Sequence, residues 1–201
     1  MKFLPSLLAL AIVPALVFTV AAARPDDKKP APVAGNYTID PVHSSVIFQC
    51  MHVGTSWAFG RFDTISGTFM LDPAKPENAK VEVTIDAASV NTANTKRDGH
   101  LKSPDFLDVK QFPTATFKSK SVAKKGDHGY AVTGDLTLHG VTKSVTIDME
   151  HTGGIDHPQM GKKIGFYGTL SISRSAYGIN YMPDGLGDEI KLILSVEGDA
   201  K

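Results

Sequence analysis

The sequence predicts an all-β fold, and three observations lead to that prediction. Apolar and polar residues alternate along many short segments, and strict alternation places one set of side chains on a single face of a strand. Residues typical of turns separate these segments. The chain also lacks the alternation of strand and helix patterns that indicates a parallel sheet. Many strands in series favour a barrel or a sandwich, and the alternation alone leaves both open.

The clearest alternation lies in segment 80–87, where Val81, Val83 and Ile85 share one face and polar residues separate them. The same period of two predicts seven more strands, at 45–53, 57–71, 114–122, 130–138, 141–152, 164–173 and 189–196, with a short further one at 37–40. About eight strands is the size at which a closed barrel can hold one small ligand.

Between two of these strands, His139-Gly140 is predicted to form a two-residue hairpin turn. Such a turn needs residues with positive φ, which glycine adopts at little cost and histidine more readily than most residues.

Segment 91–111 interrupts the strand rhythm. A short helical segment is expected near residues 95–108, with a helix at 95–101 followed by a turn at Ser103-Pro104. Phe106, Leu107 and Phe112 give this segment an apolar side. It could cap the mouth of a barrel or pack under a sheet, and the sequence leaves both open.

The amino-terminal region is predicted to direct export. Lys2 precedes an apolar stretch, and Ala21-Ala22-Ala23 matches a small-residue cleavage pattern, so residues 1–23 are expected to be a cleaved signal peptide. Residues 24–35 are rich in Pro, Lys and Asp and are expected to be a flexible lead-in. A single domain at 36–201 is expected to follow. The mature protein is expected to be periplasmic, or alternatively secreted, with no stable membrane anchor.

The overall composition argues against a nucleic-acid partner, because 21 basic residues balance 21 acidic ones. The one cysteine, Cys50, cannot form an internal disulfide. The fold must therefore be stable from its core alone.

Several stretches resemble the YceI-like family. They are 37–48, 60–62, 100–109, 112–119, 134–143, 173–178 and 188–192, and they follow the family's order across the whole predicted domain. The resemblance implies a lipocalin-like antiparallel β-barrel in an exported protein. It also implies a long apolar ligand inside the barrel, a polyisoprenoid such as a quinone or a polyprenyl phosphate.

Residues that face the interior of such a barrel are the expected ligand contacts. From the aligned apolar sets we expect Val46, Phe48, Val81, Val83, Ile85, Phe117, Leu136, Leu138, Ile147, Phe166, Leu170, Ile172, Leu192 and Leu194 in the lining. The alternative from the pattern alone is a solid core without a cavity. One bulge would invert the facing of every residue after it.

Cationic side chains at strand ends are candidates for a lipid phosphate, since a guanidinium can bind phosphate through two hydrogen bonds. Arg61, Arg97, Lys102 and Arg174 are the candidates. Arg174 is preferred, together with Tyr177, because both lie in a stretch that resembles the family. The alternative for each cation is a solvated charge or a structural ion pair.

Histidines also recur in these stretches, at positions 43, 52, 100 and 139. His43 and His52 have opposite parity in one unbroken strand and would face opposite sides. A structural histidine or a polar ligand contact is therefore expected in preference to a metal site.

No catalytic motif is visible, so a carrier is expected in preference to an enzyme, with no cofactor. A third alternative is a stress-related interaction protein with a packed core. Ile193 lies opposite the face of Leu192 and Leu194, and it suggests a homodimer contact on the outside of the barrel.

Overall fold

The computed structural model describes residues 30–201. The predicted signal peptide and residues 24–29 of the lead-in lie outside the described residues. No helix in the part of the chain that the structure describes is long and apolar enough to span a membrane.

Residues 30–201 contain eleven strands and one α-helix, which confirms the all-β prediction. The strands are β1 Gly35–Ile39, β2 Ser45–His52, β3 Ser56–Phe62, β4 Ile65–Leu71, β5 Lys80–Asp86, β6 Val90–Asn91, β7 Thr114–Lys125, β8 Gly129–Leu138, β9 Val141–His157, β10 Gly161–Ser173 and β11 Leu186–Ala200. The helix is α1 Thr95–Leu101, and three 3₁₀ turns lie at Pro76–Asn78, Ala87–Ser89 and Ser175–Tyr177.

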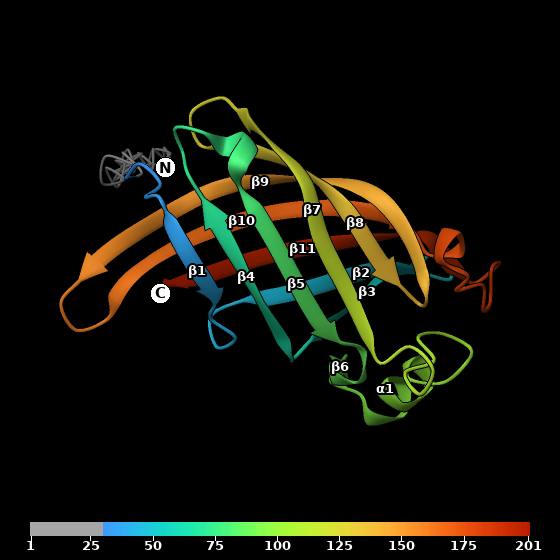
Figure 1. Cartoon of the computed structure of the whole chain (residues 1–201). Helices are drawn as coiled ribbons and strands as arrows, with labels where there is room; N and C mark the ends of the chain where they lie inside the picture. Colours follow the sequence, from blue (N-terminus) through green and yellow to red (C-terminus); the bar gives the residue numbers. More distant parts are fainter. Residues whose placement is uncertain (1–29) are drawn as a thin grey trace, which may run out of the picture.

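Eight of these strands form a closed antiparallel barrel (Figure 1). Their order is β1-β4-β5-β7-β8-β9-β10-β11, and pairing of β1 with β11 closes the ring. The barrel, rather than a sandwich, is therefore confirmed. Closure leaves no edge along this ring and encloses the inward faces of the strands.

Strand β11 is shared by two partners on one of its edges. Its first part pairs with β2 from Ile190↔Cys50 to Ser195↔Ser45, and its last residues pair with β1. At the junction, Glu197 N–H donates to Ser44 Oγ at 3.0 Å and Asp40 N–H donates to the Glu197 carbonyl at 2.9 Å. These bonds continue the ladder where one partner strand replaces the other.

The predicted strand 57–71 is wrong in one respect, because it consists of β3 and β4 with a break at Asp63-Thr64. Thr64 N–H donates to Ser89 Oγ at 3.0 Å, and Asp63 accepts a 2.7 Å hydrogen bond from Asn91 Nδ2. These side-chain partners satisfy the polar groups where the strand pairing stops.

The two local predictions about the turn and the helix are confirmed. His139 and Gly140 have φ of 50° and 73°, the left-handed pair that the hairpin requires. Helix α1 begins where Asn94 Oδ1 accepts from Arg97 N–H at 3.0 Å and ends at Leu101, and turns replace the helix up to residue 108.

Helix α1 lies at one end of the barrel, beside the β10–β11 connection. The ring of Tyr181 from that connection is 5.0 Å from His100 and 5.1 Å from Phe106. Phe112 packs on His139 of the β8–β9 turn at 4.6 Å. The segment therefore packs against two connections at one end of the barrel.

Candidate functional site: an apolar cavity inside the barrel

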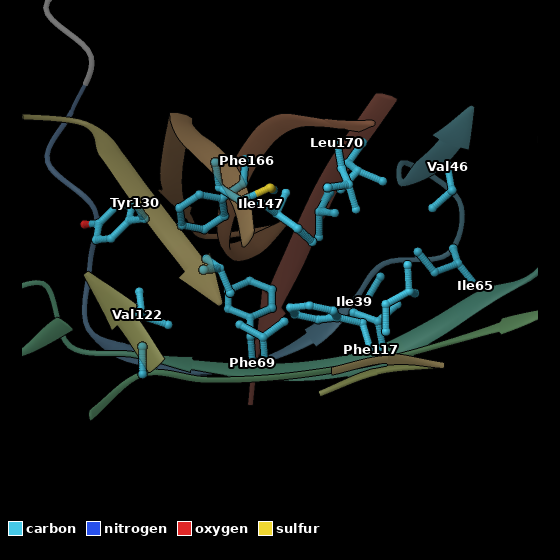
Figure 2. A pocket seen from close by; sticks show the side chains of 18 of the residues that line it. Ile39, Val46, Ile65, Phe69, Phe117, Val122, Tyr130, Ile147, Phe166 and Leu170 are labelled. Carbon is cyan, nitrogen blue, oxygen red and sulfur yellow. The ribbon is translucent and has the colours of Figure 1, made fainter. Parts of the chain in front are cut away.

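An apolar cavity of about 150 Å³ lies inside the barrel (Figure 2). Its wall consists of Ile39, Val46, Ile65, Phe69, Met70, Leu71, Ala79, Val81, Val83, Ile85, Phe117, Val122, Tyr130, Val132, Leu136, Ile147, Met149, Phe166, Leu170, Leu192, Leu194 and Val196. A cavity of this size and lining stays dry and can hold a benzene-sized molecule.

The register of the strands explains why these side chains meet. Directly paired residues of an antiparallel sheet share a face. Val83 pairs with Phe117, which in turn pairs with Leu136, so three strands contribute neighbouring inward side chains. The inward apolar residues of neighbouring strands therefore lie side by side and form a continuous apolar wall.

Most of the expected lining residues lie in this wall. They are Val46, Val81, Val83, Ile85, Phe117, Leu136, Ile147, Phe166, Leu170, Leu192 and Leu194. That they contact a ligand stays a prediction. The cavity itself shows that the alternative of a completely filled core does not hold.

Phe48, Leu138 and Ile172 lie outside the cavity wall, contrary to the expectation. Phe48 packs against Phe62 at 5.7 Å and covers Gly60, where an added Cβ would lie 2.3 Å from the Phe48 ring. Ile172 is buried and pairs with Ile190, and Leu138 is the last residue of β8 before the hairpin turn. All three lie toward the end that carries α1.

The structure argues against the expected phosphate contact of Arg174, because its guanidinium already binds backbone carbonyls. The side chain is only 5% exposed. Nη1 donates to the carbonyls of Ile179 (2.9 Å) and Tyr181 (2.8 Å), while Nε and Nη2 donate to those of Gly187 and Leu186 (3.0 Å each). The charge therefore holds the β10–β11 connection in place.

Tyr177 is also placed away from the cavity wall. It is 1% exposed, and its carbonyl is 3.0 Å from His139 Nδ1. Burial raises the pKa of its hydroxyl. Its backbone thereby ties the β10–β11 connection to the β8–β9 turn.

The other cationic candidates face outward or toward polar partners. Arg61 is exposed and pairs with Asp63 at 2.6 Å. Arg97 is exposed and donates to the Thr92 hydroxyl (2.8 Å) and carbonyl (2.7 Å). Lys102 borders a polar groove with Asp63, Asp86 and Asp98, which disfavours an anion.

Eleven wall residues were missed by the sequence reasoning. They are Ile39, Ile65, Phe69, Met70, Leu71, Ala79, Val122, Tyr130, Val132, Met149 and Val196. For four of them the signal was present, because Tyr130 and Val132 share the parity of Leu136, Met149 shares that of Ile147, and Val196 shares that of Leu194.

A cluster of charged side chains joins β10, β11 and the end of β1 at the barrel surface. Lys163 Nζ lies 2.5 Å from Asp199, 2.9 Å from Glu197 and 3.3 Å from Asp40. His43 Nδ1 lies 2.7 Å from Asp40 Oδ2. Asp40, His43 and Glu197 could together approach a metal ion, but the Lys163 ammonium already supplies their positive charge.

The cluster predicts a loss of stability in acid. Hydrogen bonds from His43, from two backbone N–H groups and from Lys163 hold the pKa of Asp40 well below its usual range. Its contribution is present above the unfolded-state pKa of about 3.9 and is lost as pH falls below it. We expect the melting temperature of Asp40→Asn to depend less on pH than wild type between about pH 5 and pH 2.

Asp127→Asn is the matched control for that experiment, since Asp127 is exposed in the β7–β8 loop. It should keep the wild-type acid profile. Parallel profiles for wild type and Asp40→Asn would show that this carboxylate does not contribute to the acid sensitivity.

Known proteins resemble this chain both in sequence and in structure. The family model for a YceI-like domain matches residues 37–198. The chain belongs to the YceI-like family. Protein YceI of Escherichia coli O6:H1 is 44% identical over 168 residues, which cover 83% of this chain and 87% of that protein.

Solved YceI-like barrels have the same architecture. The YCEI protein of Campylobacter jejuni is 34% identical, with a TM-score of 0.65 over 75% of this chain and 90% of that one. BcnA of Burkholderia cenocepacia is 27% identical, with a TM-score of 0.71 over 79% and 98%. A polyisoprenoid binding domain from Saccharophagus degradans shares the fold at 17% identity, with a TM-score of 0.64 over 84% and 100%.

Proposed function

We propose that this protein is an exported, non-enzymatic carrier that binds a long apolar lipid of the polyisoprenoid class inside the barrel. The observation that carries the proposal is the apolar cavity enclosed by the closed barrel. The structural neighbour from Saccharophagus degradans is described as polyisoprenoid binding, which supports the same class of ligand.

The energetics favour an apolar chain in this cavity. Burial of each methylene group stabilises the complex by about 0.8 kcal/mol. The cavity has room for about one isoprene unit, since such a unit is close to benzene in size. A longer chain requires the wall to move, and the unbranched side chains of Met70 and Met149 can adapt most readily.

The test is to identify what the protein carries. Mature protein, residues 24–201, would be purified without detergent from a bacterial periplasm and extracted with organic solvent, beside a mock purification. We expect near-stoichiometric isoprenoid lipid by mass spectrometry. A protein that arrives empty and also fails to bind added geranylgeraniol would contradict the proposal and favour an interaction protein without a small-molecule ligand.

The homodimer stays a prediction. The outer face of β3 exposes Trp57 (49%) and Phe59 (53%), and on the neighbouring strands Ile47 pairs with Ile193. These side chains add apolar surface to the outer face, beside Arg61 and Gln49, and a second subunit could pack there.

A further inference from the structure

Two polar atoms near one end of the cavity lack hydrogen-bond partners among the described residues. They are the Tyr130 hydroxyl and His128 Nδ1, and both are buried. A buried polar atom without a partner costs about 1–3 kcal/mol, so such atoms in a folded protein call for an explanation.

Strand pairing puts these two residues on the inner face. Tyr130 pairs with Met149, which also lines the cavity. The ladder continues one step beyond β8, because His151 N–H donates to the His128 carbonyl at 2.8 Å, and the two imidazole rings stack at 6.2 Å. Residues 128 and 130 therefore share the inward parity.

The Tyr130 side chain connects the polar atoms with the cavity. Only 2% of this residue is exposed, and its ring lines the wall beside Phe166, at 6.1 Å between centroids. Figure 2 shows the ring at one end of the cavity, with Val46 and Ile65 at the other, and the hydroxyl directed away from the remaining wall. The hydroxyl therefore lies behind the ring, and the end group of a chain in the cavity must pass the ring to reach it.

The charges nearby disfavour an anionic end group. No lysine or arginine among residues 30–201 lines the cavity. Lys125, at the adjoining end of β7, pairs with Asp148 at 2.9 Å, and Lys163 is held by three carboxylates. An anion buried without a cation carries a large desolvation cost, whereas an uncharged oxygen does not.

We propose that Tyr130 and His128 form a polar subsite for an uncharged oxygen-bearing head group, a hydroxyl or a carbonyl, on the lipid. The Tyr130 hydroxyl donates to the ligand oxygen. His128 Nδ1 accepts from a ligand hydroxyl or, in the other tautomer, donates to a carbonyl. This inference rests on the proposed function and narrows its ligand from polyisoprenoids in general to neutral ones.

The experiment compares three probes with the same chain: geranylgeraniol, geranylgeranyl phosphate and the corresponding hydrocarbon. Their dissociation constants would be measured by displacement of a fluorescent lipid from delipidated full-length mature protein. We expect geranylgeraniol to bind at least about fivefold more tightly than the hydrocarbon, which corresponds to one net hydrogen bond. We expect the phosphate to bind more weakly than the alcohol.

Tyr130→Phe isolates the hydroxyl. We expect this variant to lose the preference for the alcohol while its affinity for the hydrocarbon stays within about twofold of wild type. Tyr177→Phe is the matched control, because the Tyr177 hydroxyl is equally buried and without a partner among the described residues but lies outside the cavity wall. It should keep the wild-type preference.

The outcomes separate this inference from the proposed function. Equal binding of alcohol and hydrocarbon, a preference for the phosphate, or an equal loss in both tyrosine variants would overturn the neutral-head subsite and leave the carrier intact. No binding of any probe would overturn the carrier and the subsite together.

Discussion

Replacing Arg174 by methionine is expected to lower the free energy of unfolding by about 3–5 kcal/mol. The guanidinium donates to four backbone carbonyls in the β10–β11 connection. Each buried carbonyl left without a donor costs about 1–3 kcal/mol, and movement of the connection recovers part of the sum. In a domain of this size, the melting temperature should fall by about 10 °C or more.

Arg61→Met is the control for this experiment, since Arg61 is exposed and within residues 30–201 it forms an ion pair only with the exposed Asp63. It should change the free energy of unfolding by about 0.5 kcal/mol or less. Arg174→Met could instead be as stable as Arg61→Met and lose affinity for a phosphorylated isoprenoid. That result would contradict the structural role of Arg174 and support binding of a lipid phosphate by its guanidinium.

Filling the cavity is expected to weaken lipid binding strongly. Leu170 lines the cavity, so in Leu170→Trp the indole would occupy space that the ligand chain needs (Figure 2). Displacement of one isoprene unit, at about 0.8 kcal/mol for each buried carbon, removes about 4 kcal/mol before the chain rearranges. We expect the affinity for geranylgeraniol to fall at least about tenfold in the same displacement assay.

The neighbouring residue provides the control. Ser171 is exposed and has the opposite parity in β10, so Ser171→Trp places the same indole outside the barrel. Its affinity should stay within about twofold of wild type. Both variants should remain folded by circular dichroism, because overpacking typically costs only about 1–3 kcal/mol. Equal affinities in the two variants would place the lipid outside this cavity.

The strands could be predicted well because the alternation of apolar and polar residues follows their burial. The break at Asp63-Thr64, where the parity of the inward-facing residues changes, could not be located in this way. Ala58, Gly60 and Phe62 belong to the inner parity of β3, whereas Ile65 and Phe69 of β4 have the other parity. An unbroken strand through this point would assign Ile65, Phe69 and Leu71 of the wall to the outside. The break depends on distant partners, because Ser89 and Asn91 supply the hydrogen bonds at Thr64 and Asp63.

Arg174 illustrates a different limit of the sequence. Its motif marks the residue as special, and a buried guanidinium and a phosphate-binding one have the same sequence signal. The difference depends on where residues 179–187 fold back around the side chain, which is a long-range property of the β10–β11 connection. The volume of the cavity is likewise a sum over many side chains, so no single segment could predict it.

The sharing of β11 between β1 and β2 also has a kinetic consequence. Tyr37 in β1 pairs with Ala200 in β11, so the ring cannot close before β11 has been made. Closing so long a loop delays folding, and contacts this distant in sequence are typical of slow-folding topologies. Until then the apolar interior is open to water, and a lipid present at that moment could act as a template on which the barrel assembles.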